Sequence, residues 1–307
     1  MLRIRAADMG RLRHVFRGPQ GIRVVWSLII FAVLLTPLTL INIILMRDYP
    51  SLYTSDITPG ASLLIETVQV FFIVGATVVT GRIEGRAVWS YYGLNGRRLG
   101  VKLLAGWTGG LICLSMVVGV LHAGHFLIFN GWALHGLPIL TYGLVWLLDF
   151  LMVGLREELM YRGYLQVTLT RGMGFWPAAI LVSALFGAGH ITNTGETVVG
   201  IVGVMIRALV YCWLLRLTGS LWLGIGFHAA WDWAQSFLYG TPQSGHVMQG
   251  HLFSTHPLGD PLMSGGTVGP EGSLLWAPPF ALGLLVLFWV LRRAGLSVAA
   301  RPAPDRT

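Results

Sequence analysis

Charged residues are scarce in this chain of 307 residues. They make up only 11% of the sequence, whereas soluble domains usually carry about 25%. Hydrophobic residues make up 54% of the sequence, and the mean hydropathy is +0.68. This composition excludes an ordinary soluble globular protein.

Cysteine is scarce as well, and several protease motifs are missing. The two cysteines, Cys113 and Cys212, lie in apolar runs, so neither a disulfide framework nor a zinc site built from thiolates is available. The chain has no H-E-x-x-H zinc helix and no G-x-S-x-G serine elbow. The Pro-Leu-Gly-Asp sequence at 257–260 lacks the first glycine of the aspartyl G-x-G-D pattern. These absences exclude three common ways of hydrolysing a peptide bond.

Long apolar segments, by contrast, recur along the whole chain. A helix needs about 20 apolar residues to cross a hydrocarbon core about 30 Å thick. We count eight such windows, of which the fifth is short: 24–46, 61–80, 103–121, 137–155, 175–190, 198–217, 220–239 and 274–291. The predicted fold is therefore all-α, a polytopic membrane protein with about eight transmembrane helices that enclose an intramembrane cavity.

The basic residues indicate how these helices are oriented. The chain has 21 Lys and Arg against 13 Asp and Glu, a net charge of +8. If both termini are cytoplasmic, 17 of the 21 basic residues fall on the inner side, as the positive-inside rule requires. The outer loop at 240–273 has no Lys or Arg. We therefore expect a plasma-membrane protein with cytoplasmic termini, in contact with membrane lipids and with no nucleic-acid partner.

Three ionisable residues stand alone inside the apolar windows. They are Glu66 in the second window, Asp149 in the fourth and Arg207 in the sixth. Charged side chains are costly in the membrane and usually face the bundle interior. We expect each to make an interhelical ion pair or hydrogen bond, with Arg207 as a candidate partner of Glu66 or Asp149. The same residues would be the functional groups of a transporter, which is one alternative.

Other polar residues form clusters. The sequence Arg-Glu-Glu-Leu-Met-Tyr-Arg occupies 156–162, Phe-Gly-Ala-Gly-His occupies 186–190, and His-Ala-Ala-Trp-Asp occupies 228–232. Residues four apart project from one face of a helix. Glu158 can therefore pair with Arg162, and His228 can lie beside Asp232.

Helix geometry places two members of these clusters at nearly the same depth. If the fourth helix continues to about Thr170, the turn at 171–174 joins two antiparallel helices. Glu157 lies 15 residues before Gly172, and His190 lies 18 residues after it. With a rise of about 1.5 Å per residue, both are roughly 22–27 Å from the turn. They are expected to lie level with each other inside the bilayer.

These residue types suit hydrolysis of a peptide-like carbonyl. A carboxylate beside an imidazole can hold a water molecule and take its proton, a role that fits Glu157 and His190. A second imidazole can stabilise a developing oxyanion. His228 fits this donor role if its helix tilts towards the cavity, and Asp232 can fix its tautomer.

At these positions the sequence resembles the CPBP group of membrane proteases, which includes the type II CAAX prenyl endopeptidases and bacteriocin-processing and self-immunity proteins. Three family motifs are matched in order, E-E-x-x-x-R by Glu157, Glu158 and Arg162, F-x-x-x-H by Phe186 and His190, and H-x-x-x-N/D by His228 and Asp232. The resemblance implies that 137–239 is the catalytic core. The rest of the chain then consists of a basic cytoplasmic N-terminus at 1–23, N-terminal transmembrane helices at 24–136, an outer loop at 240–273, a last transmembrane helix at 274–291 and a cytoplasmic tail at 292–307.

The resemblance also implies roles. Glu157 would activate water with the help of His190, and His228 with Asp232 would hold the oxyanion. Glu158, Arg162 and Phe186 would support the site. The prenyl endopeptidases carry Asn at the last motif position, and an ionised Asp cannot donate a hydrogen bond, so Asp232 is expected to orient His228.

The sequence allows a mechanism with or without a metal, and a protein with or without catalytic activity. Glu157, His190 and His228 could supply the three protein ligands of a catalytic zinc, whereas the mechanism that uses protein groups alone needs no cofactor. The expected substrate is a peptide or protein that reaches the membrane cavity. A non-catalytic immunity or chaperone-like factor that retains the fold is the alternative to an enzyme.

Overall fold

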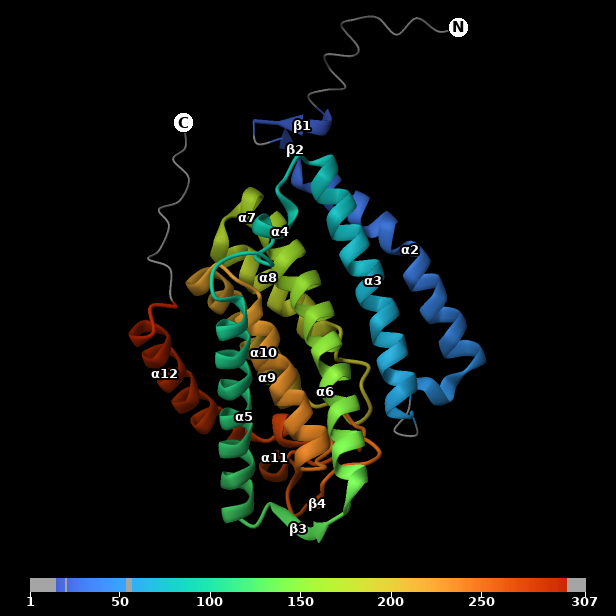
Figure 1. The fold of residues 1–307 in the computed structure, drawn as a ribbon, viewed down its shortest axis with the longest axis vertical. Helices are drawn as coiled ribbons and strands as arrows, with labels where there is room; N and C mark the ends of the chain where they lie inside the picture. The colour runs from blue at the N-terminus through green and yellow to red at the C-terminus, as the bar shows by residue number, and fades with distance from the viewer. Residues whose placement is uncertain (1–14, 20, 54–56, 297–307) are drawn as a thin grey trace, which may run out of the picture.

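The computed structural model describes residues 15–19, 21–53 and 57–296. They form a bundle of long helices with two small two-stranded sheets (Figure 1). The predicted all-α membrane architecture is therefore confirmed. Most of the predicted basic N-terminus and of the cytoplasmic tail, at 1–14 and 297–307, lies outside the described residues.

The helices and strands have the following bounds. The α-helices are α2 Val24–Asp48, α3 Pro59–Ile83, α4 Val88–Tyr91, α5 Leu99–Ala123, α6 Leu137–Glu157, α7 Val167–Met173, α8 Phe175–Ala188, α9 Val198–Thr218, α10 Trp222–Trp233, α11 Pro261–Ser264 and α12 Ala277–Arg293. The strands are β1 Arg17–Gly18, β2 Gly21–Ile22, β3 Leu127–Trp132 and β4 Phe253–Pro257. Two π-helices, η2 Glu158–Gln166 and η3 Ala234–Leu238, and three 3₁₀ turns, η1 Pro50–Tyr53, η4 Pro270–Gly272 and η5 Leu274–Trp276, complete the described part.

Six helical stretches in the described part are long and apolar enough to cross a membrane. They are α2, α3, α5, the stretch from α6 to α7, α9, and the stretch from η5 to α12. The protein is thus a multi-pass membrane protein, but the predicted count of eight spans is not confirmed. The fifth and seventh windows form shorter helices, because α8 has 14 residues and α10 has 12 before the π-turn. At about 1.5 Å per residue, α8 is roughly 21 Å long.

The fourth helix continues far beyond its apolar window, as the depth argument required. The helical stretch runs from Leu137 to Met173, and Gly174, with φ of 83°, ends it before α8 begins. The stretch changes to π-helical geometry at Glu158. π-Helical geometry inside α-helices is frequent at functional sites, and this segment begins within the polar cluster at 156–162.

Close packing of α5 against α10 puts α10 in the centre of the bundle. A Cβ atom on Gly106 would lie 2.0 Å from the carbonyl oxygen of Leu223, and one on Gly110 would lie 2.2 Å from that of Phe227. The two glycines form a G-x-x-x-G pattern, which lets the backbones of membrane helices approach closely. Every residue of α10 from Leu223 to Asp232 is consequently buried.

The segments predicted to face the cytoplasm meet at one end of the bundle, where β1, α4 and α7 lie (Figure 1). Arg171 of α7 forms an ion pair with Glu84 at the end of α3, with 3.0 Å between Nη1 and Oε2. Lys102 of α5 donates to the carbonyl of Thr218 at the end of α9. These contacts tie three of the basic segments to one another.

The opposite end carries a feature that the sequence reading missed. Strand β3 pairs with β4 in antiparallel register, from Leu127 opposite Pro257 to Trp132 opposite Phe253. The loop at 240–273 forms β4, α11 and η4. The partner strand lies more than 100 residues earlier in the chain, so local composition could not reveal the pairing.

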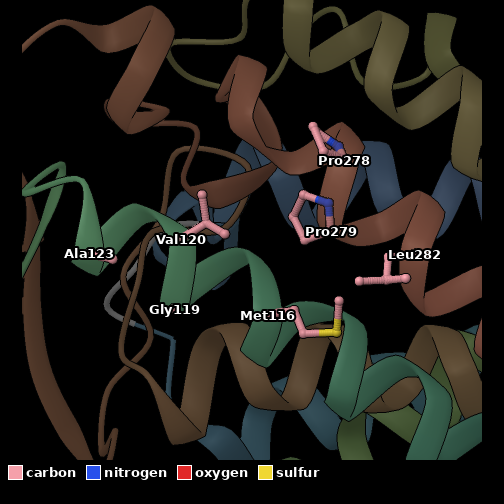
Figure 2. A pocket seen from close by; sticks show the side chains of 7 residues that line it. All are labelled: Met116, Gly119, Val120, Ala123, Pro278, Pro279 and Leu282. Carbon is pink, nitrogen blue, oxygen red and sulfur yellow. The ribbon is translucent and has the colours of Figure 1, made fainter.

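The outer surface of the helices is apolar, as expected for contact with lipid. Large side chains such as Phe71 and Leu64 are exposed in this structure. Between α5 and α12 there is an apolar hollow of about 450 Å³, lined by Met116, Gly119, Val120, Ala123, Pro278, Pro279 and Leu282 (Figure 2). No charged side chain lines this hollow, which is distinct from the polar cluster around His228.

Candidate active site

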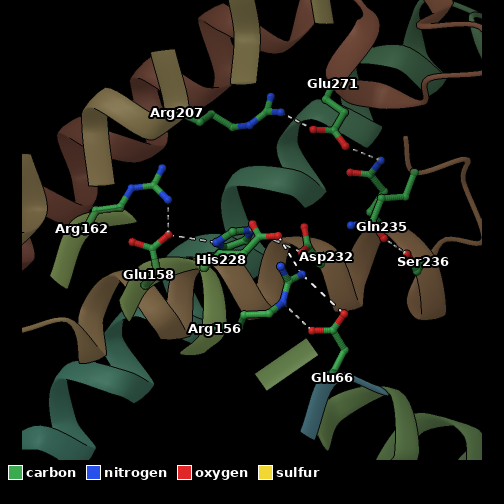
Figure 3. A network of polar contacts seen from close by, with 12 residues as sticks. Glu66, Arg156, Glu158, Arg162, Arg207, His228, Asp232, Gln235, Ser236 and Glu271 are labelled. Atoms are coloured by element: carbon green, nitrogen blue, oxygen red, sulfur yellow. Dashed lines mark hydrogen bonds and ion pairs between the residues drawn. The ribbon is translucent and has the colours of Figure 1, made fainter. Parts of the chain in front are cut away.

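His228 lies in the middle of α10, and both nitrogens of its ring face carboxylates (Figure 3). Nδ1 lies 3.0 Å from Oε1 of Glu158. Nε2 lies 3.5 Å from Oε2 of Glu157 and 3.5 Å from Oδ2 of Asp232. An ionised carboxylate only accepts hydrogen bonds, so Nδ1 donates to Glu158. Nε2 is the ring atom that faces the other two carboxylates.

The oxygen of Glu158 that contacts His228 also forms an ion pair with Arg162. Nη1 of Arg162 donates to Oε1 of Glu158 over 3.0 Å, and the two side chains are 0% and 1% exposed. The guanidinium also lies over the ring of Phe186, 4.4 Å from its centroid. The structure thus forms the Glu158–Arg162 pair expected from the sequence. It adds a function for Glu158, because that carboxylate also fixes His228.

Glu157 is paired with a residue that the sequence reading did not single out for this purpose. Nη2 of Arg156 donates to Oε1 of Glu157 over 2.9 Å. The same guanidinium reaches α3, where its Nε donates to Oε2 of Glu66 over 2.7 Å. The proposed pairing of Glu66 with Arg207 is therefore wrong. Helices α3 and α6 pack directly against each other, and this proximity decides the partner.

His190 follows the end of α8 and lies beside the cluster. Its Nδ1 is 2.8 Å from the carbonyl oxygen of Phe186, and its ring lies 4.8 Å from the ring of that residue. A carbonyl oxygen only accepts, so Nδ1 carries the proton and Nε2 is the free ring nitrogen. Among the described residues, His190 is neither hydrogen-bonded nor ion-paired to Glu157. The structure brings the other motif residues into contact but not this pair.

Residues 138–234 match the family described as type II CAAX prenyl endopeptidase Rce1-like. This part of the chain is similar to that family of proteases. The matched segment covers about a third of the 307 residues, from α6 to the first residue of η3. It contains all three motifs and every contact of His228 described above. No curated protein matches the chain significantly.

The match narrows the resemblance drawn from the sequence. The type II CAAX endopeptidase family is a family of hydrolases, and the match supports this branch of the CPBP group. It gives no support to the self-immunity branch or to a metalloprotease. Glu66 on α3 lies outside the matched segment, although it contacts Arg156 inside it.

Arg207 also has a different ion-pair partner from the Glu66 or Asp149 that we expected. Its Nη2 donates to Glu271 in η4, within the loop at 240–273. Gln235 of η3 donates to the other oxygen of Glu271 over 3.3 Å. Asp149 makes no ion pair within the part of the chain that the structure describes. The prediction failed because the partner of Arg207 lies in a loop that folds back into the bundle.

Tyr211 of α9 belongs to the site and was missed. Its ring stacks on that of His228, with the centroids 5.3 Å apart and the planes at 19°. The Arg162 guanidinium lies 5.1 Å from the centroid of the same ring. The signal in the sequence was a tyrosine one helical turn after Arg207 in an apolar segment, but a single tyrosine in such a segment does not by itself indicate a site.

The zinc site considered from the sequence would use Glu157, His190 and His228 as its ligands. Within residues 15–19, 21–53 and 57–296, no group of three or more His, Cys, Asp and Glu is arranged to hold a metal ion. Within those residues, His190 is neither hydrogen-bonded nor ion-paired to Glu157, so the three candidate ligands are not joined around one point. The arrangement of the described residues therefore does not fit the zinc considered for Glu157, His190 and His228.

Proposed function

We propose that the protein is an intramembrane endopeptidase that hydrolyses a peptide bond with a water molecule activated by Glu157 and His190. His228, oriented by Asp232 and Glu158, holds the oxyanion. The observation that carries the proposal is the position of His228 Nε2, which lies 3.5 Å from both Glu157 and Asp232. A proton donor and a base thus lie next to each other in a segment that matches a protease family.

The first step is the attack of water on the scissile carbonyl. Glu157 takes one proton from the water, and the hydroxide oxygen forms a bond with the carbonyl carbon. Oε1 of Glu157 is held by Arg156, whereas Oε2 lies towards His228. His190, whose Nδ1 is engaged by the Phe186 carbonyl, would use Nε2 to hold the same water.

The second step is stabilisation of the tetrahedral intermediate and its collapse. Its oxyanion accepts a hydrogen bond from the protonated Nε2 of His228, and a donor of this kind is worth about 3–4 kcal/mol in measured hydrolases. Glu157 then passes the proton to the leaving nitrogen, the C–N bond breaks, and a carboxylic acid and an amine result. The two carboxylates at Nε2 favour keeping a proton there.

The proposed substrate is a peptide or protein that reaches the cluster from the membrane. The proposed setting is the plasma membrane, with the basic end of the bundle in the cytoplasm and lipid around the apolar helices. The contacts among basic segments at one end of the bundle support this orientation, because Lys and Arg accumulate on the cytoplasmic side. No nucleic-acid partner is proposed.

The test uses protein purified in detergent and a fluorogenic CAAX-type peptide, offered with and without a farnesyl group. Wild type is expected to cleave at least one of the two peptides. Glu157→Gln and His228→Gln should lose activity by about 10²–10³-fold or more, while the melting temperature stays near that of wild type. Equal cleavage by wild type and Glu157→Gln would contradict the proposal. If a cellular phenotype that depends on this protein persisted in both variants, the alternative of a non-catalytic membrane factor would be favoured.

A further inference from the structure

Arg156 connects two acidic residues from different helices. Its Nε lies 2.7 Å from Glu66 of α3, and its Nη2 lies 2.9 Å from the neighbouring Glu157. The three side chains are 19%, 13% and 15% exposed for Arg156, Glu66 and Glu157 respectively. A guanidinium offers five N–H donors in a fixed plane, so one Arg can hold both carboxylates at once.

This arrangement fixes one oxygen of Glu157 and leaves the other available. Oε1 accepts from Arg156, and Oε2 lies 3.5 Å from Nε2 of His228. A Glu side chain without such a partner has several rotamers, and restricting them costs free energy. The Arg156 contact supplies that restriction in the folded protein, and it selects the orientation in which Oε2 faces the site.

Glu66 in turn restricts Arg156. Without Glu66, the guanidinium would have Glu157 as its one ion-pair partner among the described residues. It could then rotate to engage both oxygens of Glu157, because Arg and carboxylate groups commonly pair in a bidentate manner. The Nε contact with Glu66 keeps the plane of the guanidinium turned towards α3.

We propose that Arg156 is the positioning residue of Glu157, and that Glu66 of α3 positions Arg156. The inference rests on the proposed function, in which Glu157 is the base. It assigns a role in catalysis to α3, which lies outside the segment that matches the protease family. Arg156 and Glu66 act through Glu157 and do not touch the reacting atoms.

The chain contains a matched control for this test. Arg171 and Glu84 also join the long helix at 137–173 to α3, with 3.0 Å between Nη1 and Oε2. Their side chains are 10% and 1% exposed, and Arg171 lies 14 residues after Glu157 in the same helical stretch. Replacing this pair should affect packing between the same two helices without reaching Glu157.

The first readout is kinetic. Arg156→Gln should lower kcat by about 10–100-fold, because small misplacements of a catalytic group have effects of this size, and KM should stay near wild type. Arg156→Gln should also lower the melting temperature, since Glu66 is left without its cation. The double variant Glu66→Gln/Arg156→Gln should recover the melting temperature but not kcat. Arg171→Gln should lower the melting temperature with kcat unchanged.

The second readout needs no activity. In protein with ¹⁵N-labelled histidine, Glu66→Gln/Arg156→Gln should shift the Nε2 resonance of His228 as Glu157→Gln does, and leave Nδ1 unshifted. Arg171→Gln/Glu84→Gln should shift neither. An unchanged Nε2 resonance in the first double variant, or a kcat that recovers with stability, overturns the inference. Wild type that cleaves neither peptide, together with the expected shift, would contradict the proposed function and leave the positioning contact supported.

Discussion

Glu158 and His228 are joined by a hydrogen bond of 3.0 Å between Oε1 and Nδ1. This contact links the π-helical segment at the end of α6 to the central helix α10. The same oxygen accepts a hydrogen bond from Arg162. One carboxylate therefore both balances the charge of the buried Arg162 and orients the ring of His228. The position of His228 relative to Glu157 therefore depends on Glu158.

Replacing Glu158 by Gln should both destabilise the protein and reduce activity. The charge of Arg162 would then be buried without a counterion, at a cost of about 3–5 kcal/mol. Thermal unfolding in detergent measures the first effect and peptide cleavage the second. Arg162→Met/Glu158→Gln should be more stable than Glu158→Gln alone, because it removes both charges. A melting temperature equal to wild type in Glu158→Gln would contradict this account of the pair.

Asp232→Asn should remain an active enzyme. The Asn side chain can accept from Nε2 of His228 with its oxygen and can donate to an oxyanion with its nitrogen. We expect kcat within about tenfold of wild type for Asp232→Asn, and a loss of about 10²–10³-fold for Asp232→Ala, which removes one of the two polar groups that face Nε2 of His228. If both variants lost activity equally, the negative charge of Asp232 would be the essential property.

Gly106→Ala should destabilise the bundle. The added Cβ would lie 2.0 Å from the carbonyl oxygen of Leu223, so α5 and α10 would have to move apart, at a cost of about 1–3 kcal/mol. Gly119 lies on the same helix and has nothing within 4 Å of an added Cβ. Gly119→Ala is the matched control and should melt at or above the wild-type temperature. Equal melting of the two variants would contradict close packing of α5 on α10.

Chelators should leave peptide cleavage unchanged. The described side chains form no group of three or more His, Cys, Asp and Glu arranged to hold a metal ion. Activity is measured after dialysis against EDTA or 1,10-phenanthroline, alongside metal analysis of the active protein. Loss of activity that returns on addition of zinc would show that the side chains rearrange around a metal.

Much of the site could be predicted from sequence. The spacing of Glu158 and Arg162 within one helix predicted their pairing, because residues four apart face the same side. The depth argument needed the fourth helix to continue past its apolar window to about Thr170, and the structure extends it to Met173. Local helix geometry was sufficient for the pairing.

The partners of Glu66 and Arg207 could not be predicted in this way. Each has a partner far away in sequence, Arg156 in one case and Glu271 in the other. The choice depends on which helices lie next to each other and on a loop that returns to the bundle. Neither is encoded in the spacing of polar residues.

By itself, the sequence determined that this is a membrane protein with helical spans and three motifs of polar residues. Hydropathy and helical periodicity are local properties, which is why they can be read along the chain. The tertiary structure decided that His228 faces three carboxylates, that Tyr211 stacks on it, and that Arg156 joins Glu157 to α3. These contacts exist because separate helices pack side by side, and packing is a property of the whole bundle.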